Sequence, residues 1–400
     1  MPYYIGDVIK ESKRLVIRTP EEFKKTGIDA RVKTNVEGID ARNRLVHLSG
    51  GETIPYDYLV MATGADAVRL DIPGRDLEGV FVIRNLTDGL NIKSYLNEGD
   101  VRKVAIIGGG FIAMEMCEAL RNLGCEVKVI ARQQRPTVRW DPEFTKMIVE
   151  ELATNQVEFM PGTKPLAIEK GKSARLKLST CDGYLDVDMV LMGTGIRPNI
   201  VLAKEMGLAL GESGAVKVDS RQRTSLEGVW AVGDCCEVFH KVAGRWVYCP
   251  LGDIANKQGR VAGQNIGGGS PVAFPGIVGA QAFKVFNLEV ADTGLTEEEA
   301  AKYGFEPVSS LIWGLPIGRP MTKGEKLGIK LVGDKKTGKL LGAQCIGRKG
   351  AVQRVSALSI ALWSGLTVDE LGYVDLPYAP PFGGAWDAIH IAAQDLARKL

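Results

Sequence analysis

The chain has 400 residues, of which 45% are hydrophobic and 24% charged, and its formal net charge is +2. This length can bury more than one core, so we expect two or three domains. The near-neutral charge gives no reason to expect nucleic acid or a membrane surface as a partner. Because no signal peptide and no apolar run of membrane-spanning length is readable, we expect a cytoplasmic protein.

The cysteines and histidines exclude the common metal sites. The seven cysteines form no CxxC pair, and only three histidines are present, so no cluster has zinc-ligand spacing and we expect no metal. Scattered thiols of this kind are typical of a reducing compartment. The adjacent pair Cys235 and Cys236 is interpreted as structural.

Short β-type runs occupy the first region, residues 1–95. Arg14–Arg18 and Arg44–Leu48 are rich in β-branched residues between polar flanks, which is typical of strands. Tyr58–Ala62 is largely apolar and runs into Thr63 and Gly64, which predicts a buried strand entering a tight turn.

The second region, residues 96–213, reads as alternating strands and helices. Lys103–Ile107 and Glu126–Ile130 are predicted strands. Between them, Phe111–Leu123 has apolar residues at helical spacing and is followed by Gly124, a suitable residue to end a helix. A further helix is predicted over Pro142–Leu152. This alternation indicates an α/β unit with a parallel sheet.

The turn between this first strand and helix fits the pattern G-x-G-x-x-A. Gly108 allows a tight turn, Gly110 allows the backbone to approach a pyrophosphate, and Ala113 allows close packing of helix on strand. The free N–H groups at the helix start then attract the phosphates. The flanking strand and helix favour a dinucleotide site over a glycine-rich turn without a ligand.

The end of the second strand indicates which dinucleotide is bound. NAD-binding units usually place an acidic residue there to bond the ribose hydroxyl. Here the position is followed by Ala131 and Arg132, and Arg135 is near. A guanidinium in place of a carboxylate favours NADPH over NADH, the alternative being that Arg132 is a solvated surface charge.

Two further regions complete the chain. Residues 214–272 contain a predicted strand at Gly228–Val232 and a helix at Ile254–Ile266. Residues 275–400 form an α+β unit with amphipathic helices at Glu297–Lys302 and Ala351–Ser364.

Four segments together resemble the pyridine nucleotide–disulfide oxidoreductase family, in family order. They are Tyr58–Ala65, Gly193–Asn199, Thr224–Asp234 and Pro250–Gly263. The resemblance implies an α/β fold with two Rossmann-like dinucleotide-binding domains, plus an α+β C-terminal dimerisation domain. The resemblance further implies that the NAD(P)-binding domain interrupts the FAD-binding domain, which we expect to be truncated at its N-terminus.

The resemblance also implies which residues bind the cofactors. FAD is assigned to residues of the two flavin segments and of the helix that faces the flavin ring: Thr63, Gly64, Gly233, Asp234, Leu251 and Ala255. NADPH or NADH is assigned to Gly108, Gly110, Phe111, Ile112, Ala113, Arg132 and Gly195. Phe111 stands where the family has a gating aromatic, although helix packing also explains it. Glu115 stands where the family has a catalytic carboxylate, although it could equally be a solvated helix charge.

Within the family, Pro2–Gly6 and Tyr378–Phe382 look most like the coenzyme A–disulfide reductase and NADH oxidase branch. In that branch the tyrosine at position 378 reaches the partner's active site, which makes Tyr378 a catalytic candidate in a homodimer. Its alternative is a structural tyrosine beside a rigid Pro-Pro turn. A second tyrosine of some members is missing, since the chain reads Arg319-Pro320-Met321 there.

One departure concerns the start of the chain. The family's first glycine-rich FAD turn, and its redox cysteine two residues before the position of Met1, are not in this sequence. We therefore expect the chain as written to bind FAD poorly. The predicted function is an FAD-dependent NAD(P)H oxidoreductase that reduces a low-molecular-weight disulfide or persulfide. The alternatives are an NAD(P)H oxidase or peroxidase, a cysteine-free flavoprotein of the ferredoxin-reductase type, and an inactive nucleotide-binding fragment.

Overall fold

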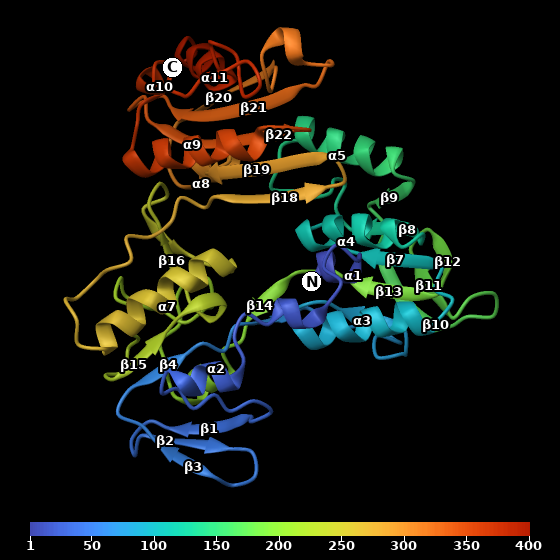
Figure 1. The fold of residues 1–400 in the computed structure, drawn as a ribbon, viewed down its shortest axis with the longest axis vertical. Helices are drawn as coiled ribbons and strands as arrows, with labels where there is room; N and C mark the ends of the chain where they lie inside the picture. Colours follow the sequence, from blue (N-terminus) through green and yellow to red (C-terminus); the bar gives the residue numbers. More distant parts are fainter. The chain divides into compact units, whose positions relative to one another are not determined.

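The computed structural model describes every residue from Met1 to Leu400 and divides into two compact units. The first unit comprises Met1–Lys10, Ala67–Gly195 and Val278–Leu400, and the second comprises Glu11–Asp66 and Ile196–Ile277 (Figure 1). Neither unit is one continuous stretch of chain. No helix combines the length and the apolar character that crossing a membrane requires.

A parallel sheet forms the nucleotide-binding part of the first unit. Its strand order is β6-β13-β7-β8-β9, with bounds Val80–Val82, Met189–Met192, Lys103–Ile107, Glu126–Ala131 and Val157–Pro161. The helices of this part are α1 (Pro2–Ile5), α3 (Leu86–Glu98), α4 (Phe111–Asn122) and α5 (Pro142–Thr154). Strand order reverses between β7 and β13, and ligands of such sheets bind at the carboxyl end of this reversal.

A small antiparallel meander packs beside this sheet. It consists of β10 (Pro165–Lys170), β11 (Leu176–Thr180) and β12 (Gly183–Val187). Ile168 and Leu178 of the meander share one buried cluster with Ala105 and Val190 of the parallel sheet. The meander therefore covers the apolar sheet surface that helices leave open.

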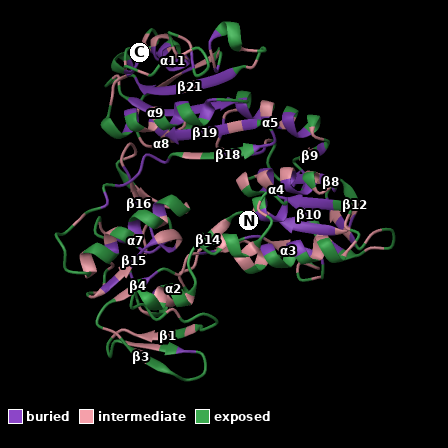
Figure 2. Ribbon diagram, in the orientation of Figure 1, coloured by how far each residue is buried: buried purple, intermediate pink, exposed green.

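An antiparallel sheet forms the C-terminal part of the first unit. Its order is β18-β19-β22-β21-β20, with bounds Gln281–Val285, Leu288–Gly294, Leu340–Gly347, Leu327–Asp334 and Pro307–Gly314. Helix α9 (Ala351–Ser364) packs on β19 and β22, while α11 (Ala388–Ala397) packs on β20, β21 and α10 (Val368–Leu371). Helix α8 (Glu297–Lys302) and the 3-10 helix η3 (Arg319–Met321) complete it. Strand β22 is buried along its whole length, as the colours of Figure 2 show.

The second unit is built from small sheets. These are β1-β2-β3 (Val36–Asp40, Leu45–Leu48, Thr53–Pro55), β4-β15 (Leu59–Met61, Val229–Ala231), β5-β14 (Ala65–Ala67, Ile196–Pro198) and β16-β17 (Val238–His240, Arg245–Val247). Its helices are η1 (Ser12–Leu15), α2 (Pro20–Lys25), α6 (Val201–Glu205), η2 (Gly233–Cys235) and α7 (Gly252–Ile266). Met61, Val229 and Ala231 lie in its main buried cluster.

One predicted strand is wrong. The β-branched run Arg14–Arg18 overlaps the 3-10 helix η1 and then continues without pairing, and Ile17 is 91% exposed. A run of this kind needs a neighbouring strand to supply hydrogen bonds and an apolar face, and none lies beside it. The other predicted strands and helices named above are confirmed within a few residues.

Candidate functional site

The glycine-rich turn after β7 has the geometry that its sequence predicts. Gly108 has φ of +117°, and a Cβ built there would lie 2.2 Å from the carbonyl oxygen of Gly193. Its amide donates to the carbonyl of Ile130 at 2.8 Å, which ties the turn to β8. Only glycine fits both the left-handed conformation and the close approach of the 193 backbone.

Gly110 is the N-cap of α4, where an anion would be attracted. No side chain caps this helix, so its first N–H groups are left for a ligand. A Cβ at Gly110 would meet no atom within 4 Å, whereas Ala113 one turn later is fully buried. The open space over an uncapped helix start fits the pyrophosphate of a dinucleotide. Ile112, also predicted to bind, is 41% exposed.

The remaining residues predicted to bind the nucleotide lie around the carboxyl end of the same sheet. Arg132 is exposed directly after β8, and Arg135 donates to the carbonyl of Trp140 at 3.3 Å. Gly195, after β13, has φ of +107° and open space where a side chain would stand. A guanidinium at position 132 is therefore accessible to a phosphate group.

Phe111 is held by two other aromatic rings. Its ring stacks on Phe283 of β18 at 5.2 Å and meets the edge of Trp140 at the same distance. Trp140 is completely buried. These contacts account for Phe111 by packing, which was the alternative to its predicted role as a gate.

Glu115 is not a freely solvated helix charge. It is half-buried one turn into α4, and the hydroxyl of Tyr3 donates to its Oε1 at 3.4 Å. Burial raises the pKa of the Glu115 carboxyl, and the hydrogen bond from Tyr3 lowers it in part. A carboxyl whose pKa is raised by burial beside a nucleotide turn is a candidate functional group.

A second turn, in the other unit, brings together the predicted flavin residues of the 230s and 250s. Gly233 has φ of +76°, and a Cβ there would lie 3.3 Å from that of Ala255 on α7. Its amide donates to Oε1 of the buried Gln258 at 2.9 Å. Asp234 follows in η2, and Leu251 is the N-cap of α7 without a side-chain cap.

Thr63 and Gly64 lie at the end of β4, which pairs with β15. The Thr63 hydroxyl donates to the carbonyl of Asn199 at 2.6 Å, and the Asn199 amide donates to the carbonyl of Gly64 at 2.9 Å. With the uncapped start of α7, this end of the unit fits the ring and ribityl chain of a flavin. Neither this turn nor Gly233 leads into a long helix, so no glycine-rich helix start in this unit matches a pyrophosphate.

The adjacent cysteines, interpreted from the sequence as structural, lie in the core. Cys235 and Cys236 are free, and both are buried. The Cys235 thiol donates to the carbonyl of Val232 at 3.3 Å, and the Cys236 thiol donates to that of Gly233 at 3.4 Å. Both thiols also bond neighbouring strands, Cys235 to the carbonyl of Met61 on β4 and Cys236 to that of Ala231 on β15, and this burial supports a structural role.

Tyr378 lies on an anchored loop between α10 and α11. Gly318 donates to the carbonyl of Pro380 at 2.7 Å, and the buried Arg354 donates to that of Phe382 at 3.3 Å. These bonds fix the Pro-Pro turn and leave the Tyr378 side chain 57% exposed. The tyrosine is therefore presented outward, away from the core.

Several residues at these sites escaped the sequence analysis. Tyr3 holds Glu115 in place, and Gln258 holds Gly233. Arg139 and Trp140 fix the segment after β8. Tyr3 and Gln258 lie within the quoted family segments, but nothing in those segments singles them out, and their roles are visible only from their tertiary partners. The sequence offered one signal, the isolated Trp140 directly before a helix N-cap.

Comparison with known proteins places the chain in a family. Residues 4–259 match the model of the pyridine nucleotide-disulphide oxidoreductase family, and residues 280–388 match its dimerisation domain. An NAD(P)H sulfur oxidoreductase (CoA-dependent) of Pyrococcus furiosus is 36% identical over 98% of this chain and 89% of that protein. An NADH oxidase of Methanocaldococcus jannaschii is 35% identical over 100% of this chain and 90% of that protein.

The solved structures agree. An NAD-dependent persulfide reductase from A. fulgidus superimposes with a TM-score of 0.95 and 34% identity, covering 100% of this chain and 75% of that one. The expected α/β fold with a C-terminal dimerisation domain is thereby confirmed. The chain belongs to the pyridine nucleotide-disulphide oxidoreductase family, a family of enzymes.

Proposed function

We propose that the chain is an FAD-dependent NAD(P)H oxidoreductase that reduces a low-molecular-weight disulfide or persulfide. The observation that carries the proposal is the open, uncapped helix start at Gly110, at the strand-order reversal of a parallel sheet. The names of the Pyrococcus furiosus and A. fulgidus relatives support a sulfur substrate. FAD, when bound, would accept hydride from NAD(P)H and pass electrons to sulfur.

The chain's own residues do the binding and orienting. The first N–H groups of α4 bond the nucleotide pyrophosphate, and Gly108 keeps the turn tight enough for this approach. The exposed guanidinium of Arg132 bonds the 2′-phosphate, which favours NADPH over NADH. Glu115, whose Oε1 accepts a hydrogen bond from Tyr3, is assigned to the nicotinamide end of the nucleotide.

The flavin contacts are assigned to the other unit. Asp234 bonds the ribityl chain, and the uncapped N-terminus of α7, from Leu251 to Ala255, stabilises negative charge on the reduced ring. Thr63 and Gly64 are assigned to the other side of the flavin site. Gln258 positions Gly233 through a buried hydrogen bond.

The dimerisation domain indicates a homodimer. We assign to Tyr378 a role at the substrate site of the partner subunit, since its side chain is exposed on a loop whose two anchors keep it from folding inward. A hydroxyl in that position can donate a hydrogen bond to a sulfur substrate or stabilise a thiolate.

A second candidate function is an NAD(P)H oxidase. The Methanocaldococcus jannaschii relative bears that name at nearly the same identity. The two cysteines at the proposed flavin turn, Cys235 and Cys236, are buried, so a disulfide substrate cannot reach either thiol. An oxidase needs no thiol attack on a disulfide.

The test is a substrate comparison with purified protein incubated with FAD. NADPH oxidation is followed at 340 nm without oxygen, in the presence of coenzyme A disulfide or polysulfide, and then in air without either. We expect sulfur-dependent oxidation to exceed oxygen-dependent oxidation. Oxidation in air alone would support the oxidase, and nucleotide binding without any turnover would support the inactive fragment.

A further inference from the structure

The segment Arg132–Asp141, which follows β8, is attached to the glycine-rich turn at its middle. The Thr137 amide donates to the carbonyl of Gly109 at 2.7 Å. Pro136 lies so close that a Cβ built on Gly109 would be 3.3 Å from its Cα. The segment therefore moves with the turn on which the nucleotide is proposed to bind, and it begins with the arginine proposed to read the 2′-phosphate.

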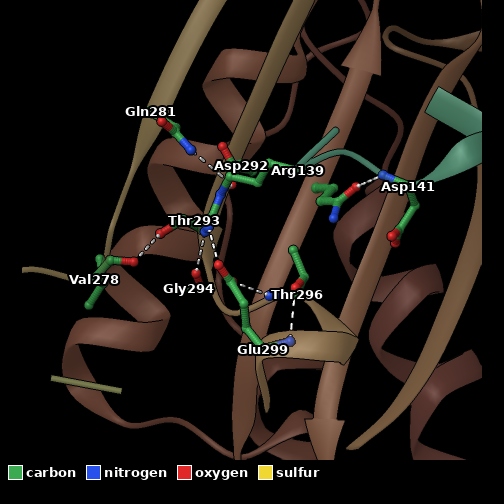
Figure 3. Close-up of polar contacts among 10 residues, drawn as sticks. Arg139, Asp141, Val278, Gln281, Asp292, Thr293, Gly294, Thr296 and Glu299 are labelled. Atoms are coloured by element: carbon green, nitrogen blue, oxygen red, sulfur yellow. Dashed lines mark hydrogen bonds and ion pairs between the residues drawn. The ribbon is translucent and has the colours of Figure 1, made fainter. Parts of the chain in front are cut away.

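Further along, Arg139 attaches the same segment to the C-terminal sheet. Its guanidinium donates to Asp292 Oδ2 at 2.6 Å, to Glu299 Oε1 at 2.5 Å and to the carbonyl of Gly294 at 2.9 Å (Figure 3). Three acceptors around one planar group fix its orientation as well as its position. Glu299 is itself fixed, because its other oxygen accepts the amide of Thr296 at the start of α8.

The acceptors belong to a row of polar residues across the sheet. Four residues are direct neighbours on adjacent strands, so their side chains share one face of the sheet. They are Gln281 on β18, Asp292 on β19, Gln344 on β22 and Lys330 on β21. Asp141 meets this row twice: its amide donates to Gln344 Oε1 at 3.0 Å, and its carboxylate lies 2.6 Å from Lys330 Nζ. The last residue of the segment is therefore bonded to two residues of this row.

The row is costly to bury, which argues for a purpose beyond stability. The Asp292 side chain is 3% exposed, and a buried ion pair is often no more stabilising than an apolar pair of the same volume. The advantage of the ion pair is directional, since only a carboxylate placed at Asp292 selects one orientation of Arg139. Aromatic packing supports the same placement, because Trp140 is wedged between Phe111 and Phe283.

We propose that Arg139 is a positioning residue for nucleotide selectivity: by fixing the segment Arg132–Asp141 to Asp292 and Glu299, it holds Arg132 at the 2′-phosphate of NADPH. This inference rests on the proposed nucleotide site. Arg139 touches no nucleotide itself and acts through the segment. The C-terminal sheet therefore takes part in choosing between NADPH and NADH.

The test is calorimetric titration of the full-length protein with NADP⁺ and with NAD⁺, which requires no turnover. In Arg139→Met we expect the Kd for NADP⁺ to rise about tenfold and the Kd for NAD⁺ to rise less than about threefold. Arg139→Lys restores one of the three bonds and should give an intermediate ratio. The matched control is Lys284→Met, which removes another ion pair between α4 and the C-terminal sheet, to Glu118, without touching the segment.

A second variant covers the case in which Arg139→Met leaves Asp292 unpaired and fails to fold. Arg139→Met combined with Asp292→Leu removes both charges of the pair and should fold while showing the same loss of preference for NADP⁺. An unchanged ratio of the two Kd values in either folded variant would overturn the inference. If the wild type binds neither nucleotide, the proposed site itself fails and the inference fails with it.

Discussion

Gly108→Ala should mainly lower the stability of the fold, whereas Gly110→Ala should mainly weaken nucleotide binding. The two glycines are separated by one residue in the same turn, but their surroundings differ. Gly108 has a positive φ and no room for a Cβ, whereas Gly110 has φ of −81° and open space. Comparing the two variants therefore separates the glycine that the fold requires from the glycine that a ligand requires.

The expected sizes follow from the geometry. Gly108→Ala adds backbone strain of about 1–3 kcal/mol and overpacking against the Gly193 carbonyl of about 1–3 kcal/mol. A loss of about 2–6 kcal/mol corresponds to a fall in Tm on the order of 10 °C for a unit of this size. Gly110→Ala loses only a favourable N-cap residue, about 1 kcal/mol at most. Its methyl group points into the space proposed for the pyrophosphate, so we expect NADP⁺ affinity to fall by about tenfold or more, which is about 1.4 kcal/mol.

Thermal unfolding and calorimetric titration with NADP⁺ measure the two effects separately. The reasoning is refuted if Gly110→Ala binds NADP⁺ like the wild type, because the pyrophosphate then lies elsewhere. It is also refuted if Gly108→Ala melts at the wild-type temperature, because the turn is then not the one described.

Three further predictions concern single side chains. Burial raises the pKa of Asp292 to about 6 despite the attraction of Arg139, so the folded state holds this proton more tightly than the unfolded state. Its contribution to stability is fully present below about pH 4 and is lost as pH rises through 6. Urea unfolding should therefore show wild type losing about 2 kcal/mol relative to Asp292→Asn between pH 4 and 7; a constant difference would contradict this. Tyr3→Phe removes the bond that lowers the pKa of Glu115, so the Glu115-dependent limb of the kcat/KM profile should move to higher pH and vanish in Glu115→Gln. Tyr378→Phe should leave the Tm and the Kd for NADP⁺ unchanged while reducing kcat for a disulfide about tenfold; an equal loss in nucleotide binding would refute a substrate role.

The sequence predicted those helices and strands whose residue spacing and flanking residues mark them locally. The helix over Ala351–Ser364 has the predicted bounds, and a glycine stands on each side of it. The strand Lys103–Ile107 also has the predicted bounds, since its apolar run ends at Gly108. The run Arg14–Arg18 has the composition of a strand but no partner strand, and pairing is a tertiary property. The meander from Pro165 to Val187 was not resolved into strands, since its short runs mix charged and apolar residues.

The residues of the candidate site also fall into those that the local sequence predicts and those that only tertiary contacts reveal. Gly108 and Gly110 were found because a tight turn against backbone constrains residue type locally. Arg139 was missed because its three acceptors come from residues more than 150 positions later in the chain, and nothing near it in sequence signals them. Phe111 was found for its position in the motif, but its two ring partners could be seen only in the folded chain.

The polar row across the C-terminal sheet has a thermodynamic consequence for distant backbone amides. Since the segment after β8 is bonded both to the nucleotide turn and to β19, opening of β19 should break contacts on which nucleotide binding depends. Ligand binding then opposes that opening by mass action, by about 2.7 kcal/mol at a hundred times Kd. Saturating NADP⁺ should therefore slow hydrogen exchange in β19 and β22, which contain none of the proposed ligands.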